Sequence, residues 1–172
     1  MYFLLVTLFH ILLAGFTTPE ILIIPVKGAT TADWNHETFW YHPWGTKGVH
    51  DGIDIFADRG TPVLAATSGF VMVTGKASLG GNIIFVAGPK WRLHYYAHLD
   101  TIEVQIGEYV RQGQTIARVG NSGSAENSPP HLHYSILTLV PYPHRWDDAP
   151  MGALKMLFLN PHQRLMDAVG KE

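Results

Sequence analysis

Four histidines and one aspartate have side-chain types and spacings that suit metal binding and proton transfer. His131 and His133 are two residues apart, and side chains two apart in a β-strand point to the same face of the sheet. Their imidazoles would therefore project into one space. His50 and Asp54 stand four apart, and His98 lies between the two pairs. We expect three of these groups to hold a zinc ion and two to flank its bound water.

The spacing of His50 and Asp54 restricts the backbone between them. Zinc ligand atoms lie about 2 Å from the ion, so the ligand backbones must be close. A fully extended strand would separate positions four apart by roughly 13 Å. Gly52 permits a bend, while Ile53 and Ile55 favour a strand over a helix. We expect His50 in a loop that leads into a strand carrying Asp54, although this pair alone would more often be a surface histidine and a turn-capping aspartate.

The other three histidines also have ordinary structural alternatives. Histidines two apart are common on exposed strands, and His98 alone could be half-buried in the core, on the strand face it is expected to share with Tyr96. Rigid loop residues at 127–130 (Asn-Ser-Pro-Pro) precede His131 and fix how its strand starts. Each alternative is reasonable by itself. Together they do not explain why all five groups occur in a chain with no other obvious metal site.

Short apolar runs separated by glycine- and proline-rich turns extend from Val49 to Leu139. Strands at such short intervals indicate an antiparallel all-β domain. The tail over residues 153–169 could hold one short helix, interrupted at Asn160-Pro161. The expected strands cover residues 53–56, 63–66, 70–74, 83–87, 93–97, 102–104, 109–110, 115–119 and 131–139.

The composition excludes several classes of protein. The 172 residues suit one domain plus a short extra segment, and a hydrophobic content of 47% is enough for a core. The net charge is -2, the sequence pI is about 6.5 and there is no basic stripe, so we expect no nucleic-acid partner. The absence of cysteine excludes disulfides, thiolate zinc sites and lipid attachment through cysteine.

The first sixteen residues, Met1 to Phe16, are almost wholly apolar and are typical of an export signal. The segment lacks a basic residue near Met1, and Ala14-Gly15 is the nearest approach to a small-residue cleavage site. It is shorter than the roughly 20 residues that span a bilayer. A buried N-terminal strand or helix and an uncleaved membrane anchor are the alternatives.

Several ordered motifs between Val49 and Ile136 resemble the M23 family of zinc metallopeptidases, the lysostaphin- and LytM-like peptidoglycan endopeptidases. The resemblance covers half of the chain, and the agreement of many motifs makes it specific. The matching residues are His50-Asp51-Gly52-Ile53-Asp54, Gly60-Thr61-Pro62-Val63, Ala65-Ala66, Gly69-Phe70-Val71, Gly80-Gly81-Asn82, Tyr96-Ala97-His98-Leu99, Gly107 to Gly113, Val119-Gly120-Asn121-Ser122-Gly123 and Pro130-His131-Leu132-His133.

The resemblance implies an all-β, barrel-sandwich-like fold of the LytM/lysostaphin type, with zinc bound by His50, Asp54 and His133. It also implies that His98 and His131 are the catalytic histidines. The chemistry agrees, because three ligands leave a fourth position for water, whose pKa zinc lowers toward about 7. A neutral His131 could take a proton as general base and deliver it to the leaving amine, while His98 orients water or hydrogen-bonds the oxyanion.

Asp51, beside the ligands, is expected either in solvent or behind a ligand rather than on the metal. The expected activity is that of an exported zinc endopeptidase, one zinc ion per chain, that cuts peptidoglycan stem peptides or cross-bridges. We expect a monomer in the periplasm or cell envelope, with possible membrane association through the N-terminal apolar segment. The sequence does not identify the scissile bond. Divalent ions other than zinc can also occupy such a site.

The expected organisation is a signal peptide or membrane anchor over 1–18, an aromatic-rich segment over 19–48, a peptidase core over 49–140 and a C-terminal extension over 141–172. Two regions depart from the family pattern. The aromatic stretch from Asp33 to Lys47 could line or occlude the cleft. The insertion at residues 141–148 could shape the substrate groove or cover an edge strand.

Two other functions remain open at this point. A catalytically silent relative that binds the wall or activates an amidase is the main alternative, but such members lack ligands and this chain retains all five groups. A lipoyl- or biotinyl-like carrier is suggested by the glycine rhythm of residues 107–123 and by Lys155 between Leu154 and Met156. A lysine on a helix surface is the simpler interpretation of Lys155.

Overall fold

The computed structural model describes residues 2–46 and 48–169. Met1, Lys47 and residues 170–172 belong to the predicted N-terminal segment, aromatic stretch and C-terminal extension, and they lie outside the described residues.

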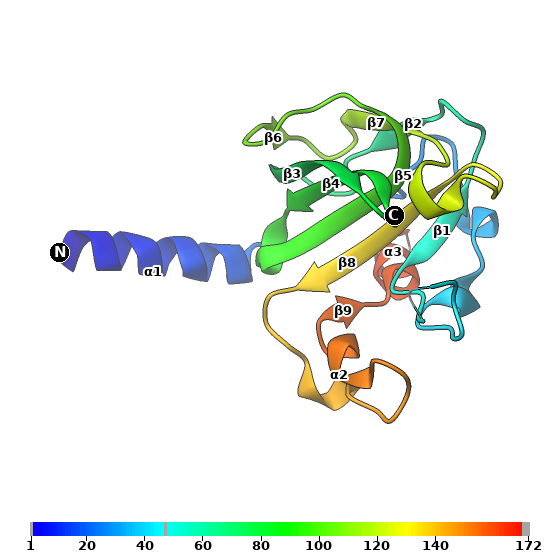
Figure 1. The fold of residues 1–172 in the computed structure, drawn as a ribbon. Coiled ribbons are helices and arrows are strands. Elements are labelled where there is room, and N and C mark those ends of the chain that lie inside the picture. Colours follow the sequence, from blue (N-terminus) through cyan, green and yellow to red (C-terminus); the bar gives the residue numbers. More distant parts are fainter. Residues whose placement is uncertain (1, 47, 170–172) are drawn as a thin grey trace.

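The strands of the described residues join in one antiparallel sheet, which confirms the predicted all-β class (Figure 1). The main path runs β1-β8-β5-β4-β3-β6; β7 also pairs with β5 and β2, and β9 with β8. The strands are β1 Ile53–Phe56, β2 Pro62–Leu64, β3 Gly69–Ala77, β4 Gly81–Ala87, β5 Arg92–Ile102, β6 Tyr109–Val110, β7 Thr115–Val119, β8 His131–Thr138 and β9 Phe158–Leu159.

Alternation along β1 and β8 separates the core from the polar face. Leu132, Tyr134 and Ile136 of β8 are fully buried in the hydrophobic core, where they join Ile53 and Ile55 of β1. The residues between them point to the other face, because successive side chains of a strand alternate. The antiparallel register pairs Asp54 with His133 and so places two polar side chains from different strands on that second face.

The strand boundaries differ from the sequence prediction mainly in β5. One continuous strand covers Arg92–Ile102, where two separate strands at 93–97 and 102–104 were expected. β5 pairs with β4 and β8 and, toward its end, with β7. A strand with partners on both edges can continue through an irregular position, and the short runs in the sequence do not show this.

The C-terminal region contains the predicted short helix, α3 Pro161–Val169, preceded by α2 Gly152–Lys155 and β9. Pro161 begins α3 rather than interrupting a longer helix, because the first turn of a helix needs no amide hydrogen at proline. β9 pairs with Ile136 and Leu137 of β8, on the edge that β1 leaves open. The edge strand is therefore covered by β9 and not by residues 141–148.

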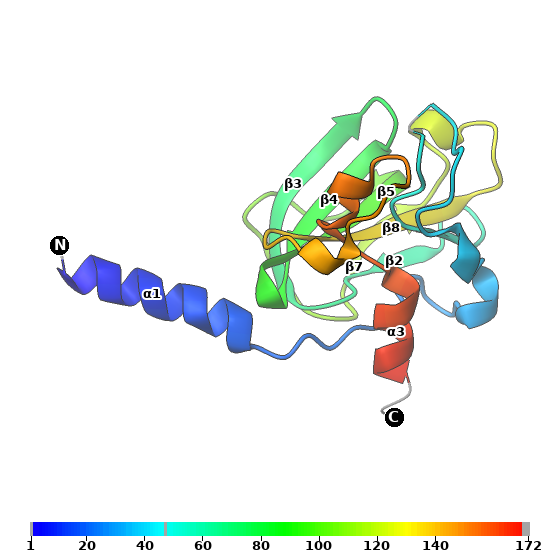
Figure 2. The same ribbon diagram turned by 90° about the horizontal axis from the view of Figure 1, so that it is seen from below.

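The apolar N-terminal segment forms helix α1, Tyr2–Thr17, which projects away from the β domain in both views (Figures 1 and 2). Most of its described side chains are exposed, so the alternative of a buried N-terminal element is wrong. The helix contacts the short turn Pro89–Trp91, where Lys90 Nζ donates to the carbonyl of Phe16 at 3.4 Å. None of the described helices is long and apolar enough to cross a membrane.

The segment after α1 enters the domain through a buried group of charges. Leu22 and Val26 pack in the core, and Ile23 N donates to Ala66 O. Glu20 has a fully buried carboxylate that pairs with a guanidinium from β5 and with one from α3. We call the set Glu20, Arg92, His94, Tyr134 and Arg164 the Glu20 cluster.

Candidate metal centre

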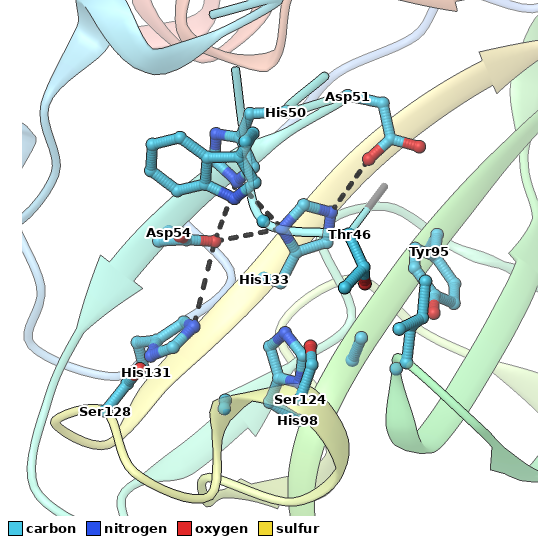
Figure 3. A pocket seen from close by; sticks show the side chains of 16 residues that line it. Thr46, His50, Asp51, Asp54, Tyr95, His98, Ser124, Ser128, His131 and His133 are labelled. Atoms are coloured by element: carbon cyan, nitrogen blue, oxygen red, sulfur yellow. Dashed lines mark hydrogen bonds and ion pairs between the residues drawn. The ribbon is translucent and has the colours of Figure 1, made fainter. Parts of the chain in front are cut away.

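A pocket of about 310 Å³ opens on the polar face of β8, and all five predicted site residues line it (Figure 3). The structure thus brings together side chains from the loop before β1, from β1, from β5 and from β8. The aromatic stretch contributes Trp44, Gly45 and Thr46 to the same pocket. Residues 141–148 do not line it, so the insertion lies outside this site.

His50, Asp54 and His133, which we call the metal triad, point three acceptor atoms at one another (Figure 3). His50 Nε2 lies 3.0 Å from Asp54 Oδ1 and 3.1 Å from His133 Nδ1, and the third side of the triangle is 2.9 Å. Ligands about 2 Å from a tetrahedral zinc lie roughly 3.3 Å apart. The donor set and its spacing therefore fit one zinc ion, and among the described residues this is the group placed to hold a metal.

Protons and charges in the metal triad are strongly coupled. Burial raises the pKa of Asp54, but the interactions with His133 and His50 outweigh it and hold that pKa well below its ordinary value. Burial lowers the pKa of His133, yet hydrogen bonds to Asp51 and Asp54 raise it to about 9. A proton is therefore held where the acceptors converge, and a cation bound there must displace it.

The backbone before β1 orients His50. Its Nδ1–H donates to the carbonyl of Thr38 at 3.2 Å, which leaves Nε2 with the lone pair that faces Asp54. The ring of Trp44 stacks on His50, with centroids 4.2 Å apart. The aromatic stretch therefore packs on a candidate metal ligand and lines the pocket, which agrees with the prediction that it could line the cleft.

Gly52 lies at the predicted bend, and β1 starts directly after it. Its backbone is not left-handed, so a second reason for glycine is the space around it. A Cβ at Gly52 would lie 2.4 Å from Tyr134 O, 2.6 Å from Ser135 Oγ and 2.9 Å from His133 Cε1. Gly52 thus allows the chain to pass directly against β8.

His98 reaches the pocket because β5 is irregular there. Between the pairs that Tyr96 and Leu99 form with β4, one residue of β4 faces two residues of β5, Ala97 and His98, and His98 has a left-handed φ of 60°. Such a bulge turns a side chain to the other face of the sheet. The prediction that His98 shares a face with Tyr96 is therefore wrong: Tyr96 is fully buried in the core, whereas His98 lines the pocket.

The two remaining histidines are each fixed by a backbone carbonyl. His98 Nδ1–H donates to Ser122 O and His131 Nδ1–H donates to Pro129 O, each at 2.8 Å. Their rings are 5.0 Å apart, and His131 Nε2 lies 3.8 Å from Asp54 Oδ1. Burial lowers the pKa of His98 to about 4. At neutral pH His98 is therefore uncharged and presents an acceptor at Nε2.

The two features that suggested a lipoyl- or biotinyl-like carrier, the glycines of residues 107–123 and Lys155, do not come together in the structure. Lys155 lies at the end of α2, and its ammonium pairs with Asp147. It lies outside the hairpins that residues 107–123 form with the sheet. The simpler interpretation, a lysine on a helix surface, agrees with this position.

A His/Asp/His acceptor set beside two carbonyl-anchored histidines, on one antiparallel sheet, defines the class of metal-dependent hydrolases. The chain belongs to peptidase family M23, whose family model matches residues 48–142. The resemblance found in the motifs is thereby confirmed.

Individual relatives support this membership. The chain is 33% identical over 129 residues to the L-Ala–D-Glu endopeptidase of Bacillus subtilis, an alignment that covers 65% of this chain and 40% of that protein. Its fold is similar to the catalytic domain of the antimicrobial peptidase lysostaphin from Staphylococcus simulans, with a TM-score of 0.62, 28% identity, and coverage of 75% of this chain and 89% of that one.

A zinc-containing peptidase from Vibrio cholerae is also similar, with a TM-score of 0.57, 30% identity, and coverage of 68% of this chain and 36% of that one. The chain spans about 40% of the length of the Bacillus relative, and a similar share of the Vibrio chain.

Proposed function

We propose that this protein is a zinc endopeptidase that hydrolyses peptide bonds in peptidoglycan stem peptides or cross-bridges. The observation that carries the proposal is the acceptor triangle of the metal triad beside His98 and His131 in one open pocket. Family membership and the activity named for the Bacillus relative, cleavage between L-Ala and D-Glu, support a peptide bond of the wall as the substrate.

His50, Asp54 and His133 would hold the zinc ion through Nε2, Oδ1 and Nδ1. Zinc supplies Lewis acidity that makes water nucleophilic near neutral pH. The protein's own contribution is to hold the three ligands in place and to keep proton acceptors beside them.

His131 is the general base in this proposal. Its Nδ1–H is tied to Pro129 O, so the neutral ring presents a bare Nε2 toward the pocket. That nitrogen accepts a proton from the attacking water and returns it to the departing amine.

His98 orients the attacking water rather than the oxyanion. With Nδ1–H donated to Ser122 O and the pKa lowered to about 4, the ring offers a lone pair at Nε2 and no second N–H at neutral pH. A lone pair accepts from water but cannot donate to a developing oxyanion. Of the two roles left open by the sequence, the hydrogen-bonding pattern favours this one.

Export follows from the substrate, because peptidoglycan lies outside the cytoplasm. We propose that α1 serves as a signal peptide or as an N-terminal anchor that associates with the membrane, followed by an aromatic-rich segment, a peptidase core and a C-terminal extension. Fractionation of cells that produce the full chain and the N-terminal sequence of the product test this: an intact chain in the cytoplasm would contradict it.

The experiment that tests the activity is muropeptide release by the purified protein, with metal content measured on the same sample and a chelated sample beside it. One zinc per chain and chelator-sensitive release of cleaved peptides are expected, and mass spectrometry of the products identifies the bond. Zinc without cleavage, or cleavage that survives complete metal removal, would contradict the proposal. The silent wall-binding alternative predicts no cleavage and is disfavoured because all five polar groups are present.

A further inference from the structure

The orientation of His133 differs from that of the other three histidines in the pocket. His50, His98 and His131 each donate Nδ1–H to a backbone carbonyl, which no substitution removes directly. His133 instead faces two side chains with its outer nitrogen, Nε2. Ser135 Oγ lies 3.0 Å away and Asp51 Oδ1 lies 3.3 Å away, as Figure 3 shows for Asp51.

These two oxygens come from different elements and are both buried. Ser135 is two residues beyond His133 on β8 and is fully buried, while Asp51 is 5% exposed in the loop before β1. The missing Cβ of Gly52 allows that loop to reach β8, because any side chain there would collide with Ser135 Oγ and His133 Cε1. The loop and β8 are therefore packed most closely at the point where Asp51 and Ser135 contact the ring of His133.

The ring orientation decides which atoms face the metal triad. With Nε2–H toward Asp51 and Ser135, Nδ1 lies 2.9 Å from Asp54 Oδ1 and 3.1 Å from His50 Nε2. Rotation of the ring by half a turn would replace Nδ1 by a carbon and remove the third ligand. A hydrogen bond from Nε2–H to Ser135 Oγ, with the Asp51 carboxylate 3.3 Å from the same nitrogen, also favours the tautomer that leaves Nδ1 unprotonated for a metal.

We propose that Asp51 and Ser135 together position His133, so that the affinity of the site for its metal depends on this pair. This inference rests on the proposed function, because it concerns the same metal triad. Asp51 and Ser135 are positioning residues: they act through His133 and lie outside the metal triad. Carboxylate contacts behind a ligand histidine typically change metal affinity by about 10- to 100-fold.

The test is the zinc dissociation constant of the full chain, measured by competition with a chromophoric chelator, for the wild type, Asp51→Asn and Ser135→Ala. Asp58→Asn is the matched control, since Asp58 is exposed and lies outside the pocket. We expect about tenfold or greater weakening for Asp51→Asn, a few-fold weakening for Ser135→Ala, and no change for the control. The absorption spectrum of the cobalt-substituted protein should change for the first two variants only, which a merely structural role would not produce.

Thermal unfolding in excess chelator separates metal binding from folding. If Asp51→Asn fails to fold, Ser135→Ala carries the test, because replacing a hydroxyl by hydrogen leaves the packing at Gly52 unstrained. Zinc affinity within twofold of wild type in both folded variants would overturn the positioning role and leave the peptidase proposal standing. A wild-type protein that binds no zinc would overturn both.

Discussion

Two buried polar clusters lie on opposite faces of the same strands and differ in the balance between their donors and acceptors. The metal triad and His131 occupy the face of β8 that carries its odd-numbered residues, and the Glu20 cluster lies behind, where Tyr134 meets His94. Alternation along a strand is enough to separate them. The two clusters therefore lie on the same strands, but their side chains have different surroundings.

In the Glu20 cluster, positive and negative groups are paired. Arg92 and Arg164 both contact the carboxylate of Glu20, Asp167 lies 3.8 Å from the second guanidinium, and His94 Nδ1 lies 2.8 Å from the hydroxyl of Tyr134. Donors outnumber acceptors, and four buried atoms of the cluster make no hydrogen bond: Glu20 Oε1, Arg92 Nε, His94 Nε2 and Arg164 Nε. Such an arrangement is expected to fix the entry of the chain after α1 and the position of α3.

In the metal triad, three acceptors face one another across about 3 Å. No internal partner can satisfy all three, so the arrangement is stable only with a proton or a cation at its centre. The comparison suggests that burial alone does not separate a functional site from a structural one. What distinguishes the functional site is an excess of acceptors over donors beside an open pocket.

The largest expected effects come from the two histidines of β8, and they should differ in kind. His133→Ala removes a ligand and should abolish metal binding together with activity. His131→Ala should keep the metal and lower kcat by about 10²- to 10⁴-fold, because proton transfer is lost. Metal analysis and peptide release on the same samples check this pair, and a fully active His131→Ala protein would show that the assigned proton transfer is wrong.

Glu20→Ala should affect folding and not the metal. Arg92 would be left buried beside a second guanidinium without its carboxylate, which destabilises proteins by about 3–5 kcal/mol. Because Arg164 is partly exposed, we expect the lower end of that range, or a fall in Tm of roughly 10 °C. Calorimetry measures this against Glu126→Ala, an exposed control, and a loss of zinc from folded Glu20→Ala would contradict the separation of the two faces.

The pH dependence of stability should also reveal the Glu20 cluster. Burial and the charges of Arg92 and Arg164 together lower the pKa of His94 from 6.5 to about 4, although Glu20 opposes them. As the pH falls below 6.5, the unfolded chain therefore takes up a proton that the folded chain refuses. Stability is lost between about pH 6.5 and pH 4, by roughly 3 kcal/mol in total, and then levels off.

Urea unfolding of the wild type and His94→Gln, in chelator at about pH 7.5 and pH 5, measures this contribution. The wild type should lose roughly 2 kcal/mol more than the variant over that interval. The comparison between variants removes the contribution of the other groups that titrate, including His98. Equal losses in the two proteins would mean that His94 is protonated in the folded state with Glu20 as its partner.

The sequence predicted the parts of the site that depend on motifs and strand period. His131 and His133 project together because β8 is regular, and the lead from His50 into β1 follows from Ile53 and Ile55. The motif resemblance placed His98 in the site, but strand period placed it on the wrong face, because its orientation depends on a bulge formed only when β4 and β5 pair. The contact of Thr38 with His50 depends on the path of a segment without period, so no local pattern indicates it.

The smallest expected effect concerns that segment. Trp44 stacks on His50 at 4.2 Å, but Thr38 O already fixes the Nδ1 of that ring. An aromatic pair contributes about 0.5–1.5 kcal/mol beyond its buried area, so Trp44→Leu should weaken zinc binding roughly two- to tenfold. Trp44→Phe should recover part of the loss, and Trp146→Leu, at a 57% exposed position outside the pocket, should change nothing. A loss as large as that of His133→Ala would mean that the carbonyl alone does not hold His50, and the metal triad would then depend on the aromatic stretch as much as on the sheet.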